Sequence, residues 1–246
     1  MDRDIKEREE AYYGSLTRPP ALRNPSRFLE SFFLRESLDG KRVLDFGCGT
    51  GPFSIFFAKR GAHVTGIDIN AHSIRRAKEN AKRHHVESLC RFLEGDGQTL
   101  PFENETFDHI ISIEVLSFVH LDKAMREIAR VLKPNGTVLI QDTLGHNPIW
   151  NLNRKIKLWR GKKTRFQVDH ILKKEDFKCF DAHFSSVETR YFDLTTLSLF
   201  PFRFAFERPI TVVSEQLAKL DHALLRTALL QPLAFKFVAR LSNKKR

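Results

Sequence analysis

The feature that most constrains this chain is an alternation of strand-like and helix-like segments between residues 42 and 143. Short apolar runs that fit strands alternate with longer amphipathic segments that fit helices. The expected strands cover 42–46, 62–69, 90–96, 107–115 and 137–143, and the expected helices cover 51–61, 70–85 and 121–136. Because parallel strands need a crossover connection, this alternation predicts an α/β fold with a doubly wound parallel sheet. Two later runs, 185–194 and 233–242, are predicted to be further strands.

The composition narrows the kinds of protein that the chain can be. Its 246 residues are enough to bury a sizeable core. Cys48, Cys90 and Cys179 form no C-x-x-C pair, which disfavours a disulfide framework or a zinc site, so no metal is expected. The first residues are charged rather than apolar, and no run approaches the roughly 18 apolar residues of a membrane span. We therefore expect a cytoplasmic protein.

The charge is divided unevenly along the chain. Residues 1–145 carry 21 Lys and Arg and 21 Asp and Glu, whereas residues 146–246 carry 20 and nine, which is the whole net charge of +11. A neutral first part and a strongly basic second part suggest separate roles. We expect a helical N-terminal cap over 1–40 and a ligand-binding core over 41–145. The rest of the sheet, with basic and apolar substrate-cap insertions, is expected over 146–246, in a single domain overall.

The segment "VLDFGCGTGPF" (43–53) places a glycine-rich turn between the first strand and the first helix. Gly47, Gly49 and Gly51 leave the backbone open to a ligand, and the helix start offers free N–H groups to an anion. The spacing is G-x-G-x-G, however, and Asp45 beside it would repel a pyrophosphate. Roughly twenty residues later Asp68 ends the second strand, where a carboxylate can accept both ribose hydroxyls. A ribose and an amino-acid zwitterion together indicate S-adenosylmethionine.

With these motifs the chain resembles the class I S-adenosylmethionine-dependent methyltransferases, and in particular their type 11, small-molecule group. The resemblance covers about residues 40–145 and rests on four segments in the family's order: "VLDFGCGTG", "GIDI", "EGDGQTLPFENETFDHIIS" and "EIARVLKPNGTVLI". It implies an enzyme with a Rossmann-like fold, a seven-stranded sheet whose last strand is antiparallel, and S-adenosyl-L-methionine as the methyl donor.

The resemblance also implies which side chains contact this cofactor. The cofactor-side residues are Asp45, Gly47, Gly49, Gly51, Asp68, Ile69, Asp96, Gly97, Glu114, Tyr12 and Tyr13. The three glycines of the turn would line the methionyl part, with Asp45 near its amino group. Asp68 would hold the ribose, Ile69 would pack on the adenine, and Asp96 with Gly97 would face the amino edge of the adenine. The two tyrosines belong to an N-terminal segment that many relatives fold over the cofactor.

The sequence indicates the residues that would bind the methyl acceptor less directly than those that would bind the cofactor. The segment 144–172 resembles the stretch after the fifth strand in a bacterial subgroup with small or lipid-like acceptors, which implies that His146 and the Asp169–His170 pair frame the pocket. His146 and His170 are the candidate catalytic residues. The candidate substrate contacts are Ser117, Phe118, His120, Trp150 and Trp159. Each histidine taken alone can equally be a polar loop or capping residue.

Residues 149–165 form a possible helix with an apolar stripe and a basic surround. Ile149, Leu152, Ile156 and Trp159 share the stripe, and no acid interrupts the segment. One interpretation is contact with an anionic lipid surface or acceptor, on the inner face of a membrane. The other is a helix packed on the fold with a solvated basic rim. A second apolar set, within 194–224, fits either a substrate lid or core packing.

Three functions stay open from the sequence. The first is a methyltransferase for a small, apolar or lipid-like acceptor. The second is an RNA methyltransferase that uses the basic half to attract phosphates, although no RNA-binding module is recognisable. The third is a cofactor-binding homologue without turnover.

Overall fold

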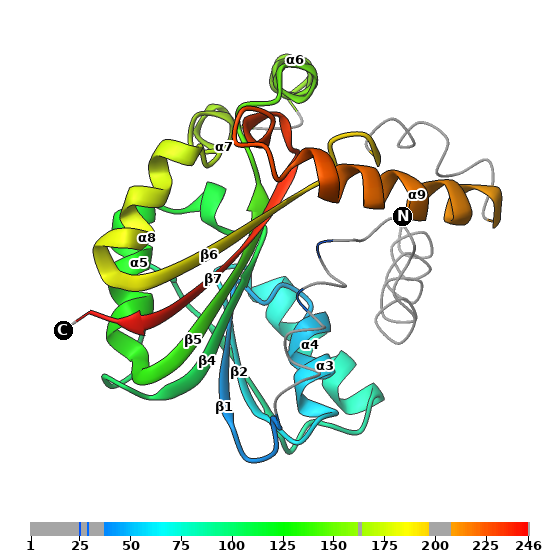
Figure 1. Ribbon diagram of the computed structural model, residues 1–246. Helices are drawn as coiled ribbons and strands as arrows, with labels where there is room; N and C mark the ends of the chain where they lie inside the picture. Colours follow the sequence, from blue (N-terminus) through cyan, green and yellow to red (C-terminus); the bar gives the residue numbers. More distant parts are fainter. Residues whose placement is uncertain (1–24, 26–28, 30–36, 162–163, 197–207, 246) are drawn as a thin grey trace.

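The computed structural model describes residues 25, 29, 37–161, 164–196 and 208–245, and Figure 1 shows their arrangement. A seven-stranded sheet runs through the middle of the molecule. Its strands are β1 (Arg42–Phe46), β2 (His63–Asp68), β3 (Cys90–Glu94), β4 (Phe107–Ile113), β5 (Leu132–Thr143), β6 (Phe184–Phe192) and β7 (Lys236–Lys244). The main helices are α3 (Pro52–Ala58), α4 (Ala71–Arg83), α5 (Leu121–Val131), α6 (Pro148–Trp159), α7 (Arg165–Asp169), α8 (Lys178–His183) and α9 (Arg208–Leu224). The short turns η1 (Leu116–Phe118), η2 (Lys174–Phe177) and η4 (Gln231–Leu233) complete the described elements.

The strand order is β3-β2-β1-β4-β5-β7-β6. Strands β1 to β5 pair in parallel, and β7 runs antiparallel to both of its neighbours. The doubly wound α/β sheet with an antiparallel last strand, which the sequence predicted, is confirmed. Both β6 and β7 come from the basic part of the chain, and they extend the sheet that the first part begins.

Helices cover both faces of the sheet because successive strand residues point to opposite sides. On one face Phe46, Ile110 and Ile140 pack toward α5 and α8. On the other face Val43 and Ile111 pack toward α3 and α4. Figure 1 shows these two helix layers on either side of the strands.

Helix boundaries follow local side-chain chemistry. The side-chain oxygen of Asn70 accepts hydrogen bonds from the N–H groups of His72 and Ser73, so α4 begins where the sequence predicted its cap. Helix α5 ends earlier than expected, at Val131. Strand β5 already begins at Leu132, opposite Phe107, and the pairing with β4 then shifts register. The residues expected to stop a helix at 134–136 therefore lie inside a strand.

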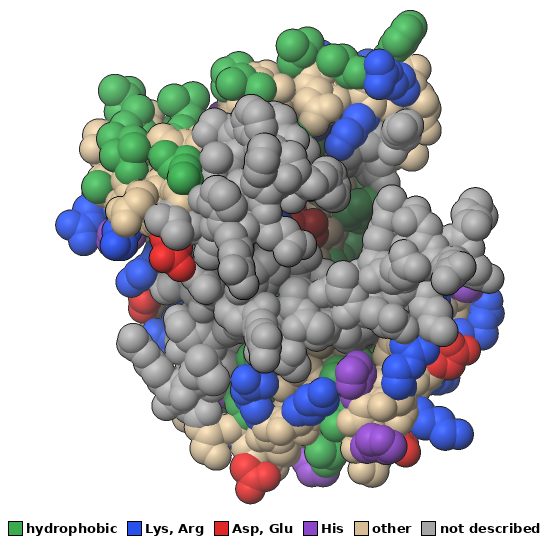
Figure 2. Space-filling model, turned by 90° about the vertical axis from the view of Figure 1, so that its right-hand side faces the viewer, with side chains coloured by type: hydrophobic (Ala, Val, Ile, Leu, Met, Phe, Trp, Pro, Cys, Tyr) green, Lys and Arg blue, Asp and Glu red, His purple; other side chains and the backbone are tan. Residues whose placement is uncertain are grey.

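Helices α6, α7 and α9, which come from the chain between β5 and β7, lie in the upper part of the molecule in Figure 1. Figure 2 shows hydrophobic side chains gathered along this upper edge, with Lys and Arg beside them. Most of the N-terminal cap expected over 1–40 lies outside the described residues, as do Tyr12 and Tyr13. Within the part of the chain that the structure describes, no helix has the length and apolarity needed to cross a bilayer.

Asp221 of α9 fixes the segment that follows β6. Its buried carboxylate accepts hydrogen bonds from the N–H groups of residues 194–196 and from the hydroxyls of Thr195 and Thr196, at 2.6 and 2.7 Å. These bonds hold α9 against the end of the sheet.

We expect Asp221→Ala to lower the free energy of unfolding by about 2–4 kcal/mol, because several buried donors lose a charged acceptor. Urea unfolding followed by circular dichroism measures the change. Glu215→Ala, on an exposed position of the same helix, is the matched control and should stay within about 0.5 kcal/mol of wild type. Equal stability of the two variants would contradict this role of Asp221.

Candidate active site

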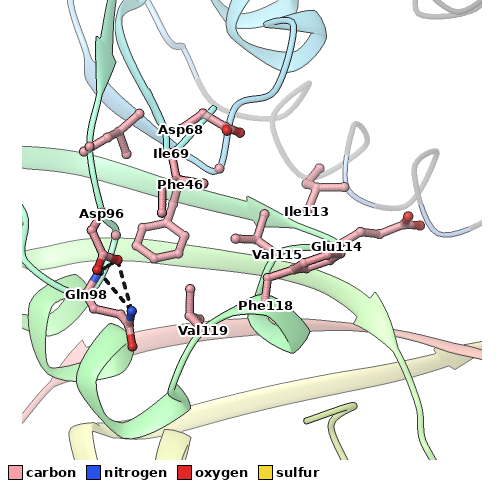
Figure 3. A pocket seen from close by; sticks show the side chains of 14 residues that line it. Phe46, Asp68, Ile69, Asp96, Gln98, Ile113, Glu114, Val115, Phe118 and Val119 are labelled. Atoms are coloured by element: carbon pink, nitrogen blue, oxygen red, sulfur yellow. Dashed lines mark hydrogen bonds between the residues drawn. The ribbon is translucent and has the colours of Figure 1, made fainter. Parts of the chain in front are cut away.

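A pocket of about 310 Å³ lies at the carboxyl ends of β1, β2 and β4, and Figure 3 shows it from close by. This edge is where open α/β sheets bind their ligands. The lining residues are Phe46, Gly47, Ile67, Asp68, Ile69, Gly95, Asp96, Gly97, Gln98, Ile113, Glu114, Val115, Phe118 and Val119. Seven of the predicted site residues, from four separate stretches of sequence, therefore meet around one cavity: Gly47, Asp68, Ile69, Asp96, Gly97, Glu114 and Phe118.

Asp68 joins the glycine turn to the start of α4. One of its carboxylate oxygens accepts the N–H of Gly49 at 2.9 Å, and the other accepts the N–H of Asn70 at 2.8 Å. Gly49 has a φ of +53°, and a Cβ placed there would meet nothing within 4 Å. The backbone of the turn is therefore bare on that side. A carboxylate has about four acceptor positions, so Asp68 keeps capacity for a ligand's hydroxyls.

Asp45 and two of the three glycines do not line the pocket. The carboxylate of Asp45 points to the face that carries α3, where it accepts a 2.6 Å hydrogen bond from the hydroxyl of Ser54. Burial raises the pKa of Asp45 to about 7, and the bond from Ser54 opposes that shift. Gly51 is the N-cap of α3, with a φ of +81°. Asp45, Gly49 and Gly51 thus shape the turn next to the pocket.

Ile69 and Asp96 bring an exposed apolar side chain and an acid to the pocket. Ile69 is 75% exposed, although it directly follows a buried strand. The carboxylate of Asp96 accepts hydrogen bonds from both the backbone N–H and the side-chain amide of Gln98, drawn in Figure 3. Gln98 in turn accepts the N–H of His120 at 3.1 Å. Gln98 therefore connects this part of the pocket to the beginning of α5.

Glu114 and Asp142 hold the loop after β4. Glu114 has a φ of +58°, which is uncommon for a residue with a side chain, and it forms an ion pair with Lys236 of β7. Asp142, at the end of β5, is buried and accepts the N–H of Leu116 at 3.0 Å. Burial raises the pKa of Asp142 to about 7. This loop carries Val115 and Phe118 into the pocket.

Beside the pocket lies a second cavity of about 170 Å³, and Val119 lines both. His170 lines this second cavity together with Asp169. The ring of His170 stacks on Phe166 with centroids 3.8 Å apart, and the ring of His120 lies 5.6 Å away. Two histidines that the sequence singled out from distant segments are therefore neighbours next to the pocket.

The remaining candidate acceptor residues lie elsewhere. The Nε2 atom of His146 accepts the N–H of Lys174 at 3.1 Å and lies 3.2 Å from the carboxylate of Glu175, so it supports η2 and lines neither cavity. Ser117 is buried. The ring of Trp150 stacks on Phe235 with centroids 4.5 Å apart. Trp159 is 85% exposed on α6.

Several residues of the site were not singled out in the sequence. Phe46 and Val115 directly adjoin Gly47 and Glu114, and their position at or just after a strand end could have identified them as pocket residues. Gln98 follows Asp96 by two residues, but its bond to His120 spans 22 positions. Asp142 was visible only as an acid within an apolar strand.

A doubly wound sheet of this order, with acids after β2, β3 and β4 around a glycine turn, defines a class I methyltransferase domain. Residues 44–140 match the family model described as "Methyltransferase domain". This part of the chain therefore belongs to the class I S-adenosylmethionine-dependent methyltransferases, as the sequence predicted.

Known proteins agree with this assignment. The chain is 36% identical to sterol 4-C-methyltransferase strm-1 of Caenorhabditis elegans over 113 residues, which cover 46% of this chain and 34% of the relative. It is 37% identical to the fatty-acid O-methyltransferase of Mycolicibacterium smegmatis over 108 residues, which cover 43% and 38%. The structure of phosphoethanolamine N-methyltransferase 2 of Haemonchus contortus, in complex with S-adenosyl-L-methionine, aligns with a TM-score of 0.56 at 19% identity, covering 83% of this chain and 49% of that one. The chain thus spans little more than a third of these curated relatives.

The raised pKa of Asp45 predicts how stability depends on pH. The pKa of this carboxyl is about 7 in the folded protein and 3.8 in the free group, so folding favours its protonated form. Its contribution to the free energy of unfolding is fully present below about pH 4 and is lost as the pH rises through about 7. We expect the free energy of unfolding to fall over this range, with Asp142 acting in the same direction. Asp45→Asn should reduce the fall, whereas Asp39→Asn, at an exposed position, should keep it. Urea unfolding at several pH values measures both, and equal pH dependence in Asp45→Asn and wild type would refute burial of Asp45 as a cause of the fall.

Proposed function

We propose that this chain transfers a methyl group from S-adenosyl-L-methionine to a small, apolar or lipid-like acceptor. The observation that carries the proposal is the convergence of Asp68, Asp96 and Glu114, from the ends of three strands, on one pocket beside a bare glycine turn. The two curated relatives are methyltransferases of sterols and fatty acids by name, which favours a lipid-like acceptor over RNA.

The residues of the pocket fit this cofactor. Asp68 offers unoccupied acceptor positions to ribose hydroxyls, and the turn around Gly49 leaves room for the methionyl part. Ile69 presents an exposed apolar surface for the adenine, with Asp96 and Gly97 at its edge. The pocket volume is at the lower end of the range typical of small-molecule sites.

The chemistry follows from placement of the acceptor. The sulfonium methyl of the bound cofactor is a strong electrophile, so the protein needs chiefly to orient the acceptor in line with it. Phe118 lines the pocket and Val119 lines both the pocket and the second cavity, and there they would exclude water and hold an apolar acceptor. His170, next to His120, would orient the acceptor or take its proton. His146 would act indirectly, through the position of Lys174.

An acceptor of this kind is held in membranes. We propose that the protein works in the cytoplasm and meets an anionic membrane peripherally on its inner face. The excess of Lys and Arg after residue 145 supports this location, because the cytoplasmic leaflet is negatively charged.

Asp68→Ala should weaken S-adenosylmethionine binding by about tenfold or more, since each lost charge-assisted hydrogen bond is worth roughly 1.5–3 kcal/mol. Isothermal titration calorimetry measures the affinity. The same change removes the acceptor of two backbone N–H groups, so a thermal melt must first establish that the variant is folded. Glu94→Ala, at the exposed end of β3, is the control and should bind as wild type does. Unchanged affinity in folded Asp68→Ala would overturn the site.

His170→Ala and His120→Ala should each lower methyl transfer, by roughly a hundredfold if the residue takes a proton, and leave cofactor affinity unchanged. Transfer of label from radiolabelled S-adenosylmethionine into a lipid extract is the measurement. His63→Ala, at the start of β2 and far from the pocket, serves as the control. Wild-type transfer rates in both variants would place the acceptor elsewhere.

A further inference from the structure

Helix α6 is attached to the fold by one side, and that side is polar. Asn151 donates to the carbonyl of Gly145 at 2.8 Å. Arg154 is 5% exposed, and it donates to the carbonyl of Leu144 at 3.1 Å and to Asn151 at 2.8 Å. Next to them, the ring of Trp150 stacks on Phe235. Arg154 is therefore the most buried residue of α6, although it belongs to the basic surround of the predicted helix.

The opposite side of α6 is apolar and open. It consists of Ile149, Leu152, Ile156 and Trp159, which we call the α6 stripe, with exposed fractions of 74%, 61%, 40% and 85%. At about 100° per residue these four side chains share one face, and Arg154 lies directly across the helix from them. One of the two interpretations of the sequence required these side chains to pack on the fold. Their exposure shows that they do not pack on the core. Nearby, Leu229 is 83% exposed in the segment whose Leu233 carbonyl accepts a hydrogen bond from Asn147.

The charged side chains that α6 itself carries are all positive. By the same helical geometry, Lys155 and Arg160 flank the stripe on its two sides, and both are exposed. The chain contains no acid from residue 143 to residue 168. An exposed apolar stripe with a terminal Trp and basic edges is the pattern of helices that lie in the interface of an anionic membrane.

We propose that the α6 stripe docks on an anionic lipid surface. Trp159, Leu152 and Ile149 enter the headgroup region, and Lys155 and Arg160 contact the acidic headgroups. Charge complementarity favours an anionic lipid surface as the occupant, because two copies of this chain docked stripe to stripe would bring the basic edges of both stripes together.

Docking at the α6 stripe would bring the membrane to the end of the molecule that holds the pocket. Helix α6 begins five residues after β5 ends, so it lies at the edge of the sheet that holds the pocket. Figure 1 shows α6 at the upper end of the molecule, and Figure 2 shows hydrophobic side chains gathered at that end. The docking deepens the membrane contact of the proposed function by naming the surface that makes it, and delivery of a lipid-like acceptor to the pocket rests in addition on the proposed methyl transfer.

Vesicle sedimentation tests the charges. The full chain should sediment with vesicles of phosphatidylcholine and phosphatidylserine, less with phosphatidylcholine alone, and less at raised salt. The double variant Lys155→Glu and Arg160→Glu should lower the partition coefficient by about tenfold or more. The matched control reverses Lys78 and Lys82, exposed on α4 and away from α6 (Figure 1), and should bind nearly as wild type does. Equal losses in both double variants would mean that net charge alone governs binding and would overturn the proposal.

Tryptophan fluorescence tests the apolar stripe. The chain has two tryptophans, so Trp150→Phe leaves Trp159 as the sole reporter. Its emission should shift to the blue and its quenching by acrylamide should fall when anionic vesicles are added. If the emission does not shift, the proposal is overturned. It is also overturned if sedimentation velocity shows a dimer that Leu152→Ser dissociates, or if the chain binds single-stranded RNA but not vesicles. Calorimetry with S-adenosylmethionine on the same samples is independent of these outcomes and shows separately whether the proposed function fails.

Discussion

The arrangement around the pocket depends on the carboxylate of Asp68. By accepting the N–H groups of Gly49 and Asn70, it ties the turn after β1 to the beginning of α4. Asn70 then caps α4 with its own side chain. Three backbone segments are thereby fixed before any ligand arrives, and the remaining acceptor positions of Asp68 are held in place. Such preorganisation lowers the cost of binding, because little has to be ordered when the ligand enters.

Asp45 and Asp142 show how an aspartate next to the pocket can serve a different purpose from the aspartates that line it. Strand residues alternate between the two faces of the sheet, so Phe46 lines the pocket while Asp45 points toward Ser54. Asp142 likewise holds the loop that carries Val115 and Phe118. Both carboxyls are buried, and burial raises the pKa of each to about 7. They anchor the backbone beside the site, and because their ionised forms are buried, the free energy of unfolding falls as the pH rises and they lose their protons.

How far the sequence predicts the molecule depends on whether a feature is local. Strand alternation, the glycine turn and the acids at the strand ends are local patterns. They predicted the sheet and several residues that line the pocket, among them Gly47, Asp68 and Asp96. The bond between Gln98 and His120, and the closeness of His120 to His170, join segments that only the folded chain brings together. The early start of β5 was missed because Pro134 and Gly136 are typical of a helix end, and they do not show how far before them the helix stops or where the next strand begins.

The same limit explains why α6 was ambiguous in the sequence. A helix with one apolar and one basic face is normally packed by the apolar face, and each buried aliphatic side chain then contributes about 1.5–3 kcal/mol. In this protein Asn151 and Arg154 attach the other face to the carbonyls of Gly145 and Leu144. Burial lowers the pKa of Arg154, and the charge of Asp142 opposes that shift, so the buried guanidinium is compensated by an acid that also holds the loop of the pocket. The polar contacts of Asn151 and Arg154 therefore set the rotation of α6, and that rotation leaves its apolar stripe facing outward.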